Sequence, residues 1–298
     1  MNKTAIIFPG QGAQKVGMCA DLYEKFESVR KIFDSLDSSV KKIIFEGPQD
    51  LLNLTIHAQP ALYAADLACA AAMKECGIEA DGAAGFSLGE IPALVYCGVM
   101  DFSQGLEFVN FRANSMHKCA KKNSGMAAVI GLSSEKIISI CDEINGAYPA
   151  NFNCGNQTVV AFSENTFESL ADAVSSCKGK ALKLAVSGAF HSPLMDKAAE
   201  EVKNFLQGKN FNSAAKPIYS NVTAQAYQNP SDLLSRHINS PVKWHETIEN
   251  MIDAGFGTFI EAGPGKTLTG LVQKINPDVK VVNVFDLKSL ESTGDCYA

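Results

Sequence analysis

A serine between two glycines is the residue in this sequence best placed for covalent chemistry. Ser87 is the centre of Gly-Phe-Ser-Leu-Gly over residues 85–89, between the small-residue segment DGAAGFS and an apolar segment that begins at Leu88. Where G-x-S-x-G joins a strand to a helix, the serine lies on a tight elbow and its hydroxyl projects outward. The N–H of Leu88 would lie at the helix N-terminus, where it can bond a developing oxyanion. The segment therefore predicts a nucleophile; the alternative is a turn serine that caps the helix.

A nucleophilic serine needs a base, and the chain contains five histidines. His191 stands in AVSGAFHSPLM, after an expected strand and before an expected helix. Loops of this kind often carry catalytic groups, although a surface or capping histidine is the alternative. No nearby carboxylate is an obvious third member: Asp196 is one candidate, and a backbone carbonyl can accept the Nδ1 proton instead. The residues thus predict a pair formed by Ser87 and His191.

Two further glycine segments suggest phosphate binding but lack a required residue. FPGQGAQK supplies G-x-G after the first strand, yet Lys15 stands where the third glycine of a dinucleotide fingerprint belongs. AGPGKT resembles the end of a P-loop, yet Ile260 stands where its first glycine belongs. We therefore expect no bound nucleotide cofactor, and we expect no metal site.

Hydrophobic periodicity sets these residues on alternating strands and helices. The first part predicts strands over 4–8 and 81–87 and helices over 18–33, 59–76, 88–99 and 103–121. Segment 125–187 then follows the order β-α-β-β-α-β of a ferredoxin-like unit, with continuation of a single α/β sheet as the alternative. The α/β alternation resumes after Ser187, and the last residues, 290–298, are the one segment expected to be disordered.

The elements together predict a fold of the α/β class. We expect a small subdomain, residues 124–188, inserted into a large discontinuous α/β domain of residues 1–123 and 189–298. The chain has 298 residues, of which 46% are hydrophobic and 19% charged, so it has enough apolar material for such a core.

Charge and composition exclude several classes of function. The 26 Lys+Arg against 32 Asp+Glu give a formal net charge of −6, and a nucleic-acid binder is usually basic. No stretch approaches the roughly 18 apolar residues of a membrane span. Pro9 and Gly10 interrupt the first apolar run too early for a signal peptide. Nine cysteines without a CxxC pair indicate reduced thiols, so we expect a cytoplasmic protein. We separately expect the protein to be a monomer.

A series of segments follows the order FPGQGAQ, QPAL, GFSLGE, the helix with Arg112, SGMAAVIGL, GAFHSPLM, SPVKW and EAGPGKTLTGL. This series resembles one enzyme family, the malonyl-CoA:acyl carrier protein transacylases of type II fatty acid synthesis. The resemblance covers residues 6–285. It implies an α/β-hydrolase-like large domain with an inserted ferredoxin-like subdomain. It also implies transfer of a malonyl group from malonyl-CoA to the phosphopantetheine thiol of acyl carrier protein, without a bound cofactor.

The resemblance assigns roles to residues at matching positions. It implies that Ser87 becomes malonylated, that His191 is its general base and acid, and that Arg112 holds the malonyl carboxylate. The oxyanion donors would be the backbone N–H groups of Leu88 and Gln11.

Further positions carry over with departures from the family pattern. The segment SPVKW implies that the backbone carbonyl of Lys243, where the family more often has Gln or Arg, orients the histidine. Gln59 and Asn153 match polar positions near the pocket. Phe86 replaces the usual histidine before the serine, and we expect it to point to the opposite side of the strand from Ser87.

Alternatives remain for the function and for two residues. An acyltransferase of polyketide assembly would use the same residues with another carrier. A serine esterase or thioesterase would use water as acceptor, and a scaffold that only binds acyl carriers would not need Ser87. Arg112 on its helix is alternatively a structural ion pair. Bulk at Phe190 resembles malonyl-selective relatives, with core packing as the alternative.

Overall fold

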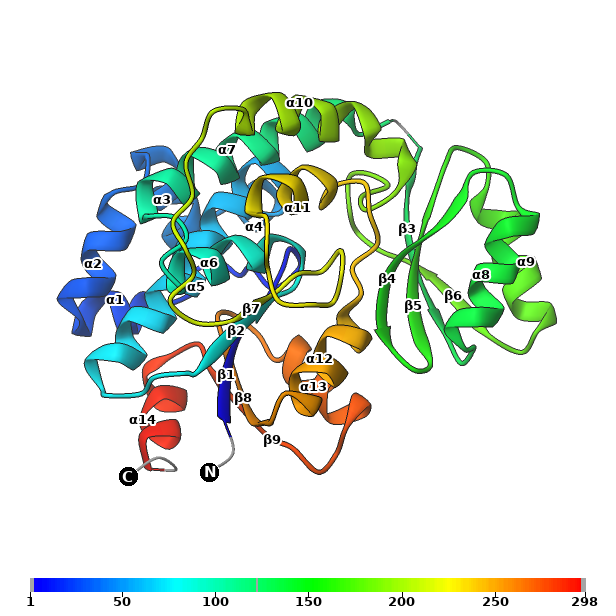
Figure 1. The fold of residues 1–298 in the computed structure, drawn as a ribbon. Helices are drawn as coiled ribbons and strands as arrows, with labels where there is room; N and C mark the ends of the chain where they lie inside the picture. The colour runs from blue at the N-terminus through cyan, green and yellow to red at the C-terminus, as the bar shows by residue number, and fades with distance from the viewer. Residues whose placement is uncertain (1–2, 122, 296–298) are drawn as a thin grey trace.

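The larger of two β-sheets contains β2, the strand that ends two residues before Ser87. Figure 1 shows where β2 lies in the fold. The computed structural model describes residues 3–121 and 123–295. Five strands lie in the order β7-β2-β1-β8-β9, and every pairing is parallel. Their bounds are β1 Lys3–Phe8, β2 Gly82–Gly85, β7 Ile218–Tyr219, β8 Phe256–Ala262 and β9 Lys280–Val284. Parallel strands are covered on both faces, which explains the apolar run TAIIF in β1.

Successive residues of β1 enter separate cores on the two faces of this sheet. Ile6 and Phe8 belong to the larger core, whereas Ala5 and Ile7 belong to a second core that contains Trp244. This alternation follows from the two-residue period of a strand. The helices of the larger-core side are α1 Ala20–Lys25, α2 Glu27–Asp34, α3 Ser38–Glu46, α4 Gln49–Leu52, α5 Thr55–Glu75, α6 Glu90–Tyr96, α7 Phe102–Cys119, α10 Asp196–Leu206, α11 Pro230–Arg236 and α14 Leu287–Asp295. Those of the second core are α12 Trp244–Asp253 and α13 Thr267–Ile275.

The smaller sheet has four strands in the order β4-β5-β3-β6, all antiparallel. Its elements are β3 Gly125–Ile130, α8 Ser134–Glu143, β4 Ala147–Cys154, β5 Gln157–Phe162, α9 Phe167–Ser176 and β6 Lys180–Lys183. The two helices pack on the face turned away from the large sheet and share a separate apolar core with the strands (Figure 1). The predicted fold class, an α/β domain with a ferredoxin-like insert, is confirmed. The boundaries 1–123, 124–188 and 189–298 stay a prediction.

Hydrogen bonds tie the small sheet to a loop of the large domain. Phe152 N donates to Val242 O over 2.9 Å, and Val242 N donates to Ala150 O over 2.8 Å. A second link joins the Oγ1 atom of Thr55 and the Oγ atom of Ser187, 3.0 Å apart. The small sheet is therefore joined to the large domain at β4, and the segment that follows β6 is joined to the start of α5.

Two helix predictions and the prediction of a disordered tail differ from the structure. The predicted helix over 18–33 is two helices, because Phe26 has extended backbone angles, φ −107° and ψ 129°. The helix predicted from residue 59 starts at Thr55 and contains Pro60. The tail predicted to be disordered forms α14 as far as Asp295, whereas residues 296–298 lie outside the described residues.

Two other sequence predictions bear on the environment of the protein. Among the helices of residues 3–121 and 123–295, none is both long and apolar enough to cross a membrane. No cysteine in the same residues forms a disulfide, and the Sγ atoms of the buried Cys19 and Cys69 lie 3.7 Å apart.

Candidate active site

Ser87 lies on a sharp elbow between β2 and α6. The strand ends at Gly85, Ser87 has a positive φ of 50°, and a short 3-10 turn, η1 Ser87–Gly89, leads into α6. A Cβ atom on Gly85 would lie 1.9 Å from the Gly89 backbone, and one on Gly89 would lie 2.1 Å from the carbonyl oxygen of Phe8. The two glycines of G-x-S-x-G are thus required by close backbone packing, as the elbow hypothesis predicts.

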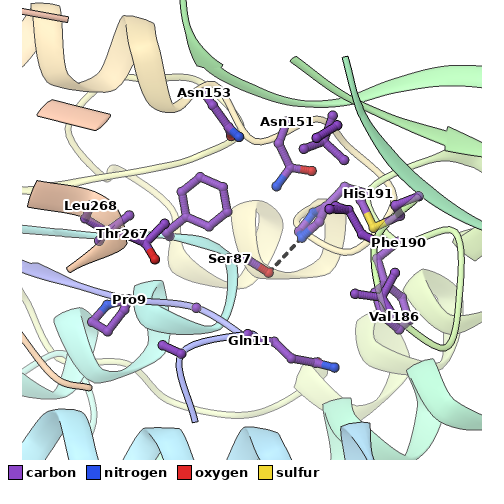
Figure 2. A pocket seen from close by; sticks show the side chains of 18 of the residues that line it. Pro9, Gln11, Ser87, Asn151, Asn153, Val186, Phe190, His191, Thr267 and Leu268 are labelled. Atoms are coloured by element: carbon purple, nitrogen blue, oxygen red, sulfur yellow. Dashed lines mark hydrogen bonds between the residues drawn. The ribbon is translucent and has the colours of Figure 1, made fainter. Parts of the chain in front are cut away.

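The Oγ atom of Ser87 and the Nε2 atom of His191 lie 2.7 Å apart. The dashed line in Figure 2 marks this hydrogen bond. His191 also has a positive φ, 57°, and its ring is buried. Its Nδ1 atom lies 2.9 Å from His237 O and 3.3 Å from Ser240 O. Because carbonyls only accept, Nδ1 carries the proton and Nε2 is free to accept from the serine hydroxyl.

The imidazole of His191 is neutral at physiological pH. Burial, together with the positive charge of Arg112, lowers the pKa of His191 from 6.5 to about 3. A neutral ring with its lone pair toward Ser87 is the state that a general base requires.

Two predictions about the partner of His191 are resolved by these contacts. The backbone-carbonyl hypothesis is confirmed, but the residue assigned to it, Lys243, is wrong. Lys243 is the residue before α12, so its carbonyl accepts from Thr247 N at 2.9 Å and Thr247 Oγ1 at 2.7 Å instead. Asp196 is not the third member either, since its Oδ1 atom accepts from Asn239 Nδ2.

Arg112 reaches the same hydroxyl from α7. Its Nη2 atom lies 3.2 Å from Ser87 Oγ, and its Nη1 atom donates to Gln59 Oε1 over 2.7 Å. The side chain is 1% exposed, and its Nε atom has no hydrogen-bond partner. Within residues 3–121 and 123–295 no carboxylate lies within ion-pair distance of Arg112, which disfavours the structural ion pair. Burial lowers the pKa of Arg112 to about 10, so the guanidinium stays charged at neutral pH.

These side chains open into a cavity of about 260 Å³ between the two sheets. Figure 2 shows lining side chains on both sides of Ser87 and His191: Val186 and Phe190 on one side, Pro9, Thr267 and Leu268 on the other. The cavity is mainly apolar, with a few polar groups that converge near the serine, as is usual for small-molecule sites.

The glycine loop after β1 lies against the elbow. A Cβ atom on Gly10 would lie 2.5 Å from the Phe86 carbonyl oxygen, so only glycine allows this approach. The next residue, Gln11, lines the cavity, and its Nε2 atom donates to Thr55 Oγ1 over 3.2 Å. Leu88 follows the serine in the first turn, where N–H groups have no helical partner. Both predicted oxyanion donors therefore belong to segments that meet at Ser87.

Asn153 lines the cavity, as the sequence predicts, and Asn151 joins it two residues earlier on β4 (Figure 2). The Oδ1 atoms of both are buried without a hydrogen-bond partner. Sequence reasoning missed Asn151, although the two-residue period of a strand indicates that it shares a face with Asn153.

Phe86 lines the same cavity as Ser87, but its ring packs against the second core, edge-on to Trp244 with centroids 5.5 Å apart. The expectation that it points to the opposite side of the strand from Ser87 stays a prediction. His237 and Ser240 were also missed: they act through carbonyls, and a carbonyl leaves no mark in a sequence.

Comparison with known proteins gives one consistent family. Residues 5–288 match the model of the acyl transferase domain. The malonyl CoA-acyl carrier protein transacylase of Bacillus subtilis (strain 168) is 38% identical over 98% of this chain and 96% of its own. The crystal structure of the enzyme of that name from Clostridium perfringens superposes with a TM-score of 0.95 at 35% identity, covering 99% of this chain and 97% of that one.

A further structure contains a carrier protein. It is a malonyl-transacylase in complex with a type II polyketide synthase acyl-carrier protein, with a TM-score of 0.95, 35% identity and 99% coverage of both chains. The match extends over nearly the full length of each of these proteins, and the elbow and its histidine lie inside the matched region. This chain therefore belongs to the acyl transferase family, among the malonyl CoA-acyl carrier protein transacylases.

Proposed function

We propose that this protein transfers a malonyl group from malonyl-CoA to the phosphopantetheine thiol of acyl carrier protein through an ester on Ser87. The observation that carries the proposal is Arg112, a buried guanidinium 3.2 Å from the serine hydroxyl with an unpartnered Nε atom. A guanidinium binds a carboxylate with two parallel hydrogen bonds, and malonyl-CoA has a free carboxylate where acetyl-CoA has none.

The first half-reaction forms the ester. Ser87 Oγ attacks the thioester carbonyl while its proton passes to His191 Nε2. The backbone N–H groups of Leu88 and Gln11 donate to the oxyanion of the tetrahedral intermediate, a contact worth about 2.7–4 kcal/mol for each donor. The C–S bond then breaks, and the proton on His191 passes to the leaving coenzyme A thiolate.

The second half-reaction runs in reverse with another thiol. The phosphopantetheine thiol gives its proton to His191, and its sulfur attacks the ester carbonyl. The bond to Ser87 Oγ breaks, and the serine recovers the proton from His191. One thioester replaces another, so the equilibrium lies near unity and no cofactor or metal enters either step.

Polar and apolar side chains give the pocket its selectivity. Gln59 fixes the Arg112 guanidinium through its Oε1 atom, so the cation has a defined position before the substrate arrives. We assign Phe190 to the acyl end, where its bulk opposes a methyl branch. Asn153 faces the cavity with an unsatisfied Oδ1 atom, which suits an N–H group of the phosphopantetheine arm.

We also propose a cytoplasmic location, supported by the free cysteines.

Intact-protein mass spectrometry tests this function. After brief exposure to malonyl-CoA we expect a malonyl adduct that Ser87→Ala abolishes and that moves to added acyl carrier protein. Arg112→Ala should slow loading severely, because truncating one partner of a buried charge pair costs about 2–5 kcal/mol. Lys118→Ala, an exposed cation on the same helix, is the control and should load normally.

Acetyl-CoA and methylmalonyl-CoA complete the experiment. Equal loading by acetyl-CoA would contradict the role of Arg112. An adduct lost to water as fast without carrier as with it would favour a thioesterase. A polyketide carrier is the second candidate acceptor, because one structural neighbour is bound to such a carrier, and the relative transfer rates to the two carriers decide between them.

A further inference from the structure

A buried asparagine outside the cavity connects the two reacting side chains from behind. Asn221 follows β7, is fully buried, and is not among the residues that line the cavity. Both ends of its amide are used: Nδ2 donates to Gly85 O over 2.7 Å, and Oδ1 accepts from Ser87 N over 2.7 Å. Its backbone N donates to Glu90 Oε2 over 2.6 Å. This side chain thus has two contacts with the elbow, although it does not line the cavity itself.

The two elbow contacts enclose the turn. Gly85 O is the last carbonyl of β2, and Ser87 N belongs to the residue with a φ of 50°. A non-glycine residue with positive φ is strained and persists only where its surroundings hold it. The amide of Asn221 supplies one acceptor and one donor at the required spacing, which neither a hydroxyl nor a carboxylate of similar size provides.

The same asparagine also holds the loop that orients His191. The Nε2 atom of His237 lies 3.3 Å from Asn221 Oδ1, and Lys243 N donates to Asn221 O over 3.0 Å. Burial lowers the pKa of His237 well below its usual value, so its ring is neutral. Since Oδ1 is an acceptor and His237 Nδ1 has no partner, the ring proton is on Nε2 and points at Asn221. Residues 237–243 are thus fixed at both ends, and His237 O accepts the His191 Nδ1 proton.

We propose that Asn221 is a positioning residue that sets the separation of Ser87 Oγ and His191 Nε2 by holding the serine elbow and the histidine-orienting loop at once. The inference rests on the proposed function only in taking Ser87 as the residue that is acylated. Proton transfer needs a short, aligned hydrogen bond, and a misplacement of about 1 Å can lower a rate about 100-fold. Loss of the amide should therefore slow acylation without weakening substrate binding.

Single-turnover malonylation of Ser87 tests the proposal, at a temperature where circular dichroism shows each variant to be folded. Asn221→Ala should lower the maximal rate about 100-fold and leave the half-saturating malonyl-CoA concentration within about twofold. The matched control is Asn250→Ala. This variant loses the 2.9 Å hydrogen bond from Asn250 Nδ2, in α12, to Ala224 O in the neighbouring loop. The bond lies away from the elbow, so the variant should load at the wild-type rate.

A double-mutant cycle separates positioning from general destabilisation. In a His191→Ala background the further change Asn221→Ala should have little effect, because the partner it positions is gone. An equal fold-decrease in the malonylation rate in both backgrounds would overturn the proposal. So would a raised half-saturating malonyl-CoA concentration with an unchanged maximal rate.

A second pair of variants keeps the test decisive if Asn221→Ala does not fold. His237→Leu retains the carbonyl that accepts from His191 but loses the ring donor to Asn221, so it should slow acylation. His237→Gln places an N–H near the same point and should restore much of the rate. Equal rates for Leu and Gln would contradict the proposal. If the wild-type enzyme forms no malonyl adduct at all, the proposed function fails instead.

Discussion

Neutrality of His191 is the residue-scale property on which the chemistry depends. Its proton lies on Nδ1 between two carbonyls, and Arg112 nearby opposes a second proton. A carboxylate partner would raise the pKa of such a ring, whereas a carbonyl brings no full negative charge. The dyad therefore keeps a free base over the whole physiological range.

This state predicts an unusual pH profile for the malonylation of Ser87. A histidine acts as base only while neutral, and the lowered pKa of about 3 keeps His191 neutral until the pH falls toward that value. Between pH 8 and pH 5 we therefore expect no decrease in kcat/KM that is due to protonation of His191. An ordinary histidine would instead cause such a decrease with a midpoint near pH 6.5. The measurement is the rate of adduct formation at low malonyl-CoA concentration.

Glu90 provides the control for that profile. Burial raises its pKa to about 7, so it titrates within the same range, and Glu90→Gln removes this contribution. A loss of activity centred near pH 6.5 in both proteins would contradict the lowered pKa of His191.

At this scale the sequence located the side chains that lie together at the cavity. Ser87 and His191 follow from motif and loop position, and Arg112 and Gln59 from the resemblance. Lys243 was wrong, because every residue has a carbonyl and no side-chain type signals which one is used. Asn221 was not found, since its contacts to Gly85 and Ser87 span more than 130 residues of sequence.

At the scale of elements, backbone packing fixes the elbow. β2 and the following turn pass so close to one another and to β1 that side chains have no room at either motif glycine. The hydroxyl of Ser87 is thus aimed by three backbone segments and not by its own rotamer alone.

Alanine at two glycines should have opposite effects. In Gly85→Ala the new Cβ would lie 1.9 Å from the Gly89 backbone, so we expect a loss at or beyond the upper end of the 1–3 kcal/mol that overpacking typically costs. Gly270→Ala, within α13 and with open space around it, should instead raise stability by about 0.5–1 kcal/mol. Denaturant unfolding measures both, and similar free energies of unfolding for the two variants would count against the close packing.

The sequence predicted most elements but not all of their ends. The sequence pattern predicted a helix from residue 59, yet α5 begins at Thr55 and contains Pro60. Periodicity continues across Phe26, so it does not reveal the extended residue that separates α1 from α2. Such breaks depend on tertiary packing, which local patterns do not contain.

At the scale of the molecule, the cavity belongs to two sheets at once. Asn151 and Asn153 come from β4 of the small sheet, whereas Ser87 and Gln11 lie in segments that follow β2 and β1 of the large one. Alternation in the sequence predicted both sheets, but their mutual placement depends on contacts such as those of Val242, which periodicity does not encode.

Substrate binding should accordingly stabilise both parts. With Ser87→Ala to prevent turnover, malonyl-CoA at 100 times its Kd should add about 2.7 kcal/mol to the free energy of unfolding. Hydrogen exchange should slow both in β4 and in the loop after β1. Arg112→Ala should remove most of this effect, and protection confined to one of the two segments would contradict a shared site.

The main-chain acceptors of His191 also affect how such an enzyme tolerates inherited change. Every amino acid supplies a carbonyl, so a codon change at Ser240 that preserves the loop leaves the second acceptor in place. In an enzyme whose histidine is oriented by an aspartate side chain, a single nucleotide substitution in that codon can remove the acceptor. Lineages with this arrangement can therefore drift at position 240 while the histidine keeps its orientation.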